Sequence, residues 1–130
     1  MKIWQESMSL SIEVYKVTTN FPNDERYGLT SQIKRAAVSI PSNIAEGSSR
    51  GSNKDFGRYL SISLGSAFEL ETQILIAKEL NLINNSNYNN ISSKLEQIQK
   101  MIIGFLNSLT NSILNDSENE VFNSYLNSNV

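Results

Sequence analysis

Cysteine and histidine are both absent from this chain of 130 residues. Without cysteine there is no disulfide framework and no thiolate metal site. Without either residue, the usual zinc sites, a Ser-His-Asp triad and a Cys-His pair cannot be built. An enzyme would have to work with carboxylates, lysines, serines and tyrosines. We therefore expect a protein that is not an enzyme and that needs no metal and no cofactor.

Long hydrophobic runs are missing as well. No stretch approaches the roughly 20 apolar residues of a membrane helix, and the first ten residues, MKIWQESMSL, have too short an apolar run for a signal peptide. We expect a cytoplasmic protein that does not use a membrane. Only two prolines and six glycines interrupt the chain, and no sustained alternation of period two indicates a strand.

Hydrophobic residues make up 39% of the chain, enough for the core of one domain. Their spacing predicts four helices, over about residues 3–19, 29–46, 53–82 and 88–114. Gly47 is the expected C-terminal cap of the second helix, and Ser52 with Asp55 reads as a capping box that opens the third. The fold class is therefore all-α: an antiparallel up-and-down four-helix bundle over residues 1–114, with a flexible or loosely docked tail at 115–130.

The first predicted helix has two apolar stripes, and a helix that is apolar on two sides is covered on two sides. One stripe, expected to pack in the bundle, holds Ile3, Leu10, Val14 and Val17. The other, expected to contact a second subunit, holds Trp4, Met8, Ile12 and Tyr15.

Pro41 lies in the middle of the second predicted helix. It has no N–H for the carbonyl of Ala37, and its ring crowds that carbonyl, so we predict a kink that either bends the helix around the core or opens it for a partner. Opposite the core stripe runs a polar ribbon of Ser31, Arg35, Ser39, Ser42 and Glu46. The ribbon is either a solvated face or a contact surface, with Ser39 and Ser42 as candidates for touching another subunit.

Glu71 falls within the predicted apolar face of the third helix, which includes Ala67, Phe68, Ile74 and Leu75. A carboxylate there is costly unless it is paired. Candidate partners are Arg26, Arg35 and Asn43. Such a polar link would fix the register of the helices. The alternative, a general acid, needs a second group and a cleft, and the sequence indicates neither.

Charge is unevenly placed along the chain. Residues 26–58 carry six cations and two anions, and residues 61–130 carry three cations and seven anions. The asymmetry indicates a basic surface on one side, or ordinary solvated helix faces. The candidates for binding nucleic acid are Lys34, Arg35, Arg50, Lys54 and Arg58. The loop GSSRGS lies before a helix N-terminus, which favours anions, but it lacks the GxxxxGK[ST] pattern of nucleotide sites.

Two long blocks carry a family resemblance: YGLTSQIKRAAVSIPSNIAEG at residues 27–47 and GSAFELETQ at residues 65–73. With FPND before them, they resemble the bacterial four-helix-bundle proteins of the 23S ribosomal RNA intervening-sequence family, over about residues 3–110. The resemblance implies a bundle that assembles as a homopentamer and has no enzymatic activity. A related branch, the accessory variability determinant of diversity-generating retroelements, is basic and binds nucleic acid, whereas this chain is net acidic.

Two functions follow from the residues and the resemblance together. The first is a homo-oligomeric protein that is associated with RNA or the ribosome. The second is a scaffold that recruits another protein without nucleic acid. RNA binding predicts that Lys34, Arg35 and Arg50 lie on one shared exposed face of the assembly, while scattered positions or burial in subunit contacts favour the scaffold. An enzyme that uses Glu46 or Glu71 would need that carboxylate to line an open pocket.

Overall fold

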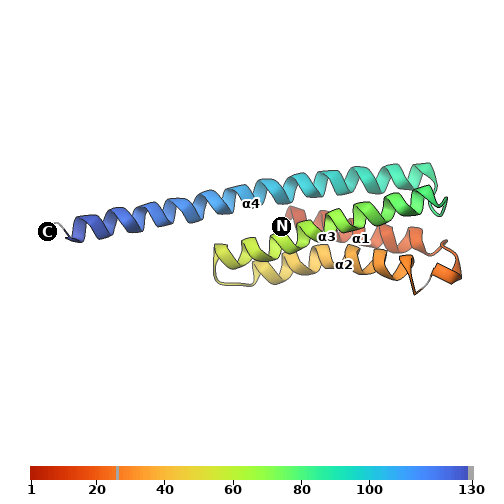
Figure 1. The fold of residues 1–130 in the computed structure, drawn as a ribbon, viewed down its shortest axis with the longest axis horizontal. Coiled ribbons are helices and arrows are strands. Elements are labelled where there is room, and N and C mark those ends of the chain that lie inside the picture. The colour runs from red at the N-terminus through yellow and green to blue at the C-terminus, as the bar shows by residue number, and fades with distance from the viewer. Residues whose placement is uncertain (26, 129–130) are drawn as a thin grey trace.

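The structure, a computed structural model, describes residues 1–25 and 27–128, with side chains described up to residue 115. It confirms the all-α class and the four predicted helices (Figure 1). The helices are α1 (Lys2–Thr18), α2 (Leu29–Ser48), α3 (Asn53–Glu79) and α4 (Asn85–Ser128), and a short 3-10 helix, η1 (Asn23–Glu25), lies between α1 and α2.

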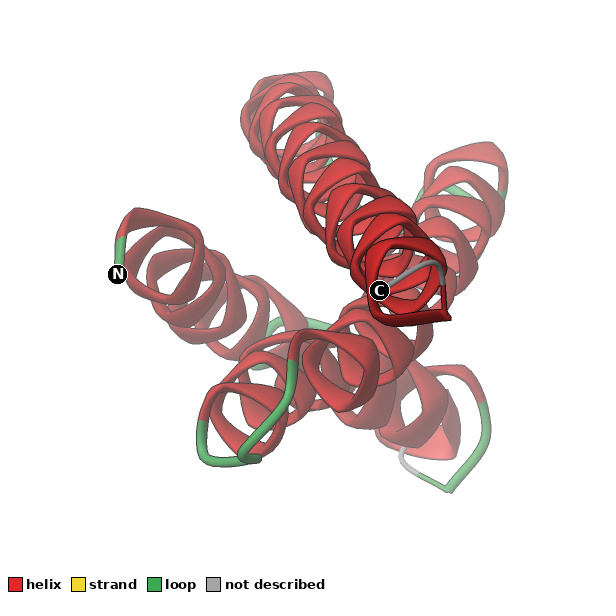
Figure 2. Ribbon diagram, turned by 90° about the vertical axis from the view of Figure 1, so that its left-hand side faces the viewer, coloured by secondary structure: helices red, strands yellow, loops and turns green. Residues whose placement is uncertain are grey.

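Each helix packs against two others. α1 and α3 both contact α2 and α4, and within the described residues α1 does not contact α3. The helices therefore form a square in chain order, which Figure 2 shows along the bundle. The core stripe of α1 is buried, and so is the α4 seam formed by Ile91, Leu95, Ile98 and Ile102. Burial of these two stripes stabilises the packing of α1 and α4 in the bundle.

Local capping sets both ends of α3. The Ser52 hydroxyl accepts the Asp55 N–H at 3.1 Å, which confirms the Ser52 half of the predicted capping box. At the other end Asn81 has a φ of 60°, and the N–H of Leu82 donates to the carbonyl of Ala77. This Schellman motif stops α3 at Glu79, three residues before the predicted end.

The prediction for Gly47 is wrong. α2 continues to Ser48, and Gly47 is buried within it. A Cβ at this position would lie 2.7 Å from the Cβ of Tyr59 and 2.9 Å from Cδ2 of Phe56. The glycine therefore lets α2 and α3 approach closely, a tertiary role that resembles a helix cap when only the sequence is read.

α4 is longer than predicted, because it continues past Leu114 to Ser128. Figure 1 shows it extending beyond the α2–α3 turn, where the other three helices have ended. At that turn the side-chain amide of Asn53 lies 3.4 Å from the Ser112 hydroxyl. The predicted tail at 115–130 is thus helical in its backbone as far as 128, while its side chains from 116 lie outside the described residues.

Pro41 does not break α2, which is helical from Leu29 to Ser48. The carbonyl of Ala37, which Pro41 leaves without its helical donor, lies 2.8 Å from the hydroxyl of Ser11 in α1. One residue before the proline, the carbonyl of Ile40 accepts the hydroxyl of Ser63 in α3 at 2.9 Å. Serines of both neighbouring helices thus donate hydrogen bonds to backbone carbonyls of α2 around Pro41. The predicted kink itself stays a prediction.

In the part of the chain that the structure describes, no helix combines the length and the apolarity needed to cross a membrane.

Candidate functional site

The most apolar of the described grooves lies between α1 and α2 and has a volume of about 590 Å³. Its rim is formed by Trp4, Met8, Ile12 and Tyr15 of α1 and by Val38 of α2, which are 36–52% exposed. The rest of the lining is formed by Ser11, Lys16, Pro41, Ser42 and Ala45. We call it the apolar groove. The second stripe of α1, predicted to contact another subunit, is thus exposed in the single subunit and gathered around one concave surface.

The helical period of α1 explains this exposure. Leu10 and Val14 are fully buried in the core, so residues offset from them by half a turn, such as Ile12, face outward. On its other side this outer stripe borders a second groove, toward α4, where Lys94 pairs with Glu13 at 2.7 Å. The α1–α4 groove is thus lined by an ion pair, while Lys16 is the one charged residue in the described lining of the apolar groove.

The predicted contact residues Ser39 and Ser42 differ in position. Ser42 is exposed and lines the apolar groove. Ser39 does not line it: its hydroxyl shares a 2.7 Å hydrogen bond with that of Ser66 in α3 and accepts the side-chain amide of Asn43 at 3.0 Å. Ser39 therefore joins α2 to α3 within the subunit, and any contact with another subunit stays a prediction.

The five candidate cations fall into two groups. Lys34 and Arg35 lie in the first half of α2, while Arg50, Lys54 and Arg58 lie around the α2–α3 turn. Roughly 20 Å of helix, at about 1.5 Å per residue, separates Lys34 from the end of α2. The shared exposed face of Lys34, Arg35 and Arg50, which was expected for the assembly, stays a prediction.

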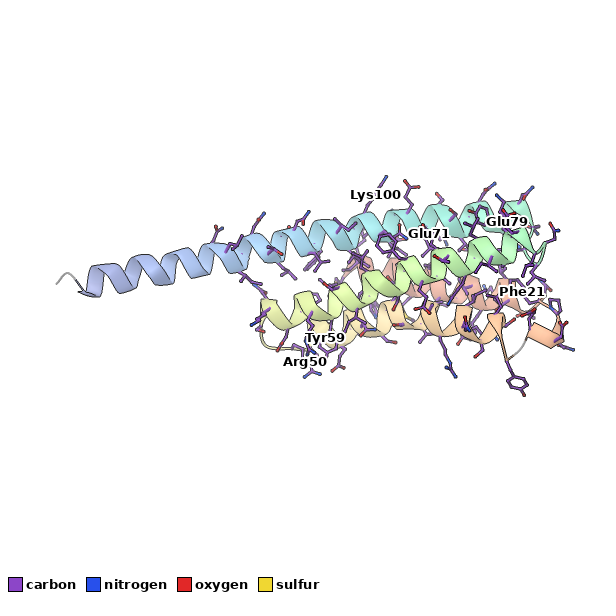
Figure 3. The ribbon with its side chains drawn as sticks, in the orientation of Figure 1. Phe21, Arg50, Tyr59, Glu71, Glu79 and Lys100 are labelled. Carbon is purple, nitrogen blue, oxygen red and sulfur yellow. The ribbon has the colours of Figure 1, made fainter. Side chains whose placement is uncertain are left out.

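At the turn, Arg50 is engaged by its own subunit (Figure 3). Its guanidinium donates to the Glu46 carboxylate and, at 2.8 Å, to the Tyr59 hydroxyl. The Tyr59 ring has Arg50 at 5.1 Å and Arg58 at 4.8 Å from its centroid. The hydrogen bond to Glu46, then the charges of Tyr59 and Glu46, raise the pKa of Arg50 above its usual value. A ligand phosphate would have to compete with Glu46 for this cation.

Lys34 and Arg35 lie in a different setting. They line a groove of about 540 Å³ with Tyr15, Tyr27, Ser31, Val38 and Ser39. Lys34 is half-buried, with its ammonium 5.0 Å from the centroid of the Tyr15 ring. Among the described residues, no carboxylate lines this groove. We call it the tyrosine–cation groove. Its positive charge is unpaired by any acid of its lining, which favours a negatively charged ligand.

Sequence reasoning missed the two tyrosines of this groove. Read along the chain, the aromatic residues near the cations did not form the interleaved pattern of a stacking platform. Tyr15 belongs to α1 and reaches Lys34 only because α1 packs against α2. Tyr27 lies in the turn before α2 and is 87% exposed. The spacing of the α1 stripe placed Tyr15 outside the core, but it did not indicate that Tyr15 would lie beside Lys34.

The predicted link from Glu71 to α2 is wrong. Glu71 is exposed on α3 and accepts the side-chain amide of Gln99 in α4 at 2.7 Å (Figure 3). Asn43 instead donates to the carbonyl of Ser39 at 2.8 Å. Arg35 is exposed on α2, and Arg26 lies outside the described residues.

The reason is the true direction of the α3 core face. Leu70 and Ile74 fill the core, while Phe68 and Leu75, assigned to the same face from the sequence, are 47% and 44% exposed. Glu71 lies on the side of α3 that meets α4, so its partner comes from that helix. Gln99 is only 8% exposed, and Glu71 supplies the acceptor that its buried amide needs.

Within residues 1–25 and 27–115, no three acidic side chains are grouped closely enough to hold a metal ion. Glu46 and Glu71 line neither the apolar groove nor the tyrosine–cation groove. The arrangement offers an apolar surface and an anion-attracting surface, side by side along α2 and sharing Tyr15 and Val38.

The family model of the 23S rRNA-intervening sequence protein matches residues 1–104. The chain belongs to this family. The match includes every residue that lines the two grooves and ends inside α4. The family resemblance seen in the sequence is thereby confirmed, while its implied pentamer and nucleic-acid binding are not tested by this match.

Among solved structures, the chain is similar to a protein of unknown function from the S23 ribosomal protein family of Bacteroides thetaiotaomicron VPI-5482. The TM-score is 0.73 at 25% sequence identity, over 80% of this chain and 97% of the other. No curated protein matches the sequence. The family match, which ends at residue 104, leaves the end of α4 outside.

Proposed function

We propose that this family member is a non-enzymatic, self-associating bundle that binds RNA in the cytoplasm and is associated with the ribosome. The observation that carries RNA binding is the tyrosine–cation groove, where Lys34 and Arg35 face a concavity without a carboxylate. Backbone phosphates supply much of the affinity between proteins and nucleic acids, so unpaired cations beside a concave surface are the first requirement.

A net charge of −2 does not oppose this proposal. At physiological ionic strength, charges farther than about 8 Å away are largely screened. The many acids of α3 and α4 therefore act weakly on a phosphate that lies in the groove of α2. Self-association supports binding further, because each subunit adds a copy of Lys34 and Arg35, and linked weak sites give a higher overall affinity.

Self-association is supported by the apolar groove. Soluble monomers rarely expose large contiguous apolar patches, and such patches mark interaction sites. The rim from Trp4 to Tyr15 runs along most of α1, next to Val38. We propose that a second copy of the chain covers it, in the homopentamer that the family resemblance implies.

The test is a titration of labelled 23S ribosomal RNA fragment with the full-length protein at two salt concentrations. The double variant Lys34→Gln/Arg35→Gln removes the groove cations. The matched control, Lys54→Gln/Arg58→Gln, removes the same charge from the α2–α3 turn. We expect the first variant to bind more weakly and to lose about 1 to 2 from the slope of log K against log salt, since each phosphate contact contributes about 0.7 to 0.9.

The control should retain most of the slope. Equal losses in both variants would show a diffuse charge effect and would remove the groove from the proposal. Absence of RNA binding at low salt, with the wild-type protein folded and assembled, would overturn the RNA function altogether.

The second candidate function is a scaffold that recruits another protein without nucleic acid. The apolar groove favours it, since such a surface can also hold an apolar helix of a partner. A wild-type protein that stays monomeric and binds no RNA would move the proposal to this candidate.

A further inference from the structure

We infer that the apolar groove of one subunit is covered by the outer face of α3 in a second copy of the chain, so that each contact joins two different surfaces. The inference rests on the proposed self-association and adds which surface of the second copy lies in the groove. It starts from a second set of exposed apolar side chains, which belongs to α3 and does not line the groove.

These side chains follow the helical period of α3. Four large apolar residues are 44–47% exposed: Ile62, Phe68, Leu75 and Ile76. Thr72, exposed as well, lies one turn after Phe68 and one turn before Ile76. We call these five residues the α3 outer face. Soluble monomers rarely expose a contiguous apolar surface of this kind, and where they do, it marks an interaction site.

The two apolar surfaces lie on different sides of the subunit. α1 and α3 occupy opposite corners of the helix square, because each packs against α2 and α4. The α3 outer face points away from the core that Leu70 and Ile74 fill, so it cannot cover the apolar groove of its own subunit. A contact between two grooves would leave the α3 outer face exposed, whereas a contact between groove and α3 outer face covers both surfaces.

The dimensions of the two surfaces agree. The rim of the groove from Trp4 to Tyr15 follows about 16 Å of α1, at about 1.5 Å per residue. The α3 outer face from Ile62 to Ile76 follows about 21 Å of α3 by the same measure. One surface is a groove between two helices and the other is the convex side of a single helix, which is the pairing of shapes used when a helix docks in a groove.

The charges are complementary too. Lys16 is the one charged residue in the described lining of the apolar groove, and no ion pair between described residues engages it. The exposed carboxylates of Glu69, Glu71 and Glu79 border the α3 outer face (Figure 3). The one cation of α3 between residues 62 and 79, Lys78, is half-buried with its ammonium over an aromatic ring. Opposite charges at the rim favour this pairing, while a contact between two grooves would give neither Lys16 an acid.

A contact between different surfaces has a consequence for the assembly. Each added copy again presents a free groove and a free α3 outer face, so association continues until the surfaces of the first and last copies meet in a ring. A contact between identical surfaces ends with a dimer. The proposed homopentamer therefore requires a contact of the first kind, which the apolar groove and the α3 outer face provide.

The experiment uses cysteine cross-linking, because the natural chain has no cysteine and introduced thiols are the only ones present. Met8→Cys places a thiol on the rim of the groove, and Thr72→Cys places one on the α3 outer face. The two full-length variants are co-expressed, and the purified protein is treated with a short bis-maleimide. We expect a covalent Met8→Cys/Thr72→Cys dimer, formed several-fold more than in either variant alone. Co-expression of Met8→Cys with Ser93→Cys, an exposed position on α4, is the matched control.

A second variant tests the same contact without cross-linking. Ile76→Glu would bury a carboxylate in the groove of the next copy, so we expect smaller species in sedimentation velocity. Circular dichroism verifies that the variant is folded, which is expected because Ile76 is exposed in the single subunit.

Three results would overturn the inference. Met8→Cys cross-linked to itself as strongly as to Thr72→Cys would show a contact between two grooves and leave self-association in place. An Ile76→Glu protein that assembles like wild type would remove α3 from the contact. A wild-type protein that sediments as a monomer would contradict the proposed self-association itself, and the inference would fall with it. RNA binding is measured separately and is decided by none of these results.

Discussion

The hydroxyl of Ser11 in α1 lies 2.8 Å from the carbonyl oxygen of Ala37 in α2, the carbonyl that Pro41 deprives of its helical partner. The same hydroxyl lies 2.9 Å from the carbonyl of Ser7, one turn earlier in α1. A hydroxyl has a single proton, and the Ser7 carbonyl already has the backbone N–H of its own helix. The unmet need is at Ala37, so the Ser11 hydroxyl acts there as a substitute for the missing N–H of residue 41.

We predict that the effects of Ser11→Ala and Pro41→Ala on stability are coupled. Ser11→Ala alone leaves a buried carbonyl without a donor and should lower the free energy of unfolding by about 1–3 kcal/mol. With Pro41→Ala, the backbone N–H returns, and Ser11→Ala should cost much less. Urea unfolding of the four proteins gives the coupling energy. Ser7→Ala is the control, because the carbonyl that its hydroxyl bonds, that of Ile3, keeps its helical donor. Equal costs of Ser11→Ala in both backgrounds would contradict the substitution.

Gly47→Ala and Gly65→Ala make the same chemical change at a packed position and at an open position, so their effects on stability can be compared. Gly47→Ala places a methyl group against Tyr59 and Phe56, and overpacking of this kind costs about 1–3 kcal/mol. Gly65→Ala, in the exposed side of α3 with nothing within 4 Å of its new Cβ, should gain up to about 1 kcal/mol of helix propensity. Urea midpoints at one protein concentration measure both. A Gly47→Ala protein more stable than wild type would show that α2 and α3 can separate at no cost.

Self-association should depend on Ile12. A carboxylate at this position, in Ile12→Glu, would be buried without a partner if a second copy covers the apolar groove, so we expect smaller species in sedimentation velocity. Ile103→Glu is the control on α4, since Ile103 is 41% exposed and Ile12 is 52% exposed. Both substitutions leave the core intact, and circular dichroism confirms folding. An assembly that is lost with Ile103→Glu and retained with Ile12→Glu would place the subunit contact on α4.

The bond between Glu71 and Gln99 has its own prediction. Glu71→Ala removes the acceptor of the buried Gln99 amide and should cost up to about 1 kcal/mol, a small value because the carboxylate is exposed. Glu71→Gln keeps an acceptor oxygen and should restore most of the stability. The measurement is the free energy of unfolding in urea. If both variants lose the same amount, the charge of Glu71 matters and the hydrogen bond does not.

Two helix starts were predicted well because their signals are local. The starts at Leu29 and Asn53 follow from the turn residues just before them, and the Ser52 cap is formed as expected. The end of α3 was missed by three residues, because the stop is Asn81 in a left-handed conformation, and the asparagine was not recognised as a cap. Gly47 was mistaken for a helix cap because its role is tertiary. It allows the close approach of Tyr59, which belongs to another helix.

The candidate site was predicted in part. The outer stripe of α1 could be read from its period, because Trp4 and Ile12 are offset from the buried Leu10 and Val14 by the geometry of a helix. The split of the cations into two groups could not be read in this way. It depends on the length of α2 between Lys34 and Arg50 and on Glu46, which pairs with Arg50 at the turn.

By itself, the sequence determined four amphipathic helices, their order and the second apolar stripe of α1, because periodicity and capping act between residues close in the chain. Only the tertiary structure decided which groups meet across helices. It placed the Ser11 hydroxyl beside the Ala37 carbonyl and the Gln99 amide beside the Glu71 carboxylate. It also placed the Lys34 ammonium over the ring of Tyr15. These partners are far apart in sequence, and the rotation of each helix about its own axis, which packing fixes, selects them.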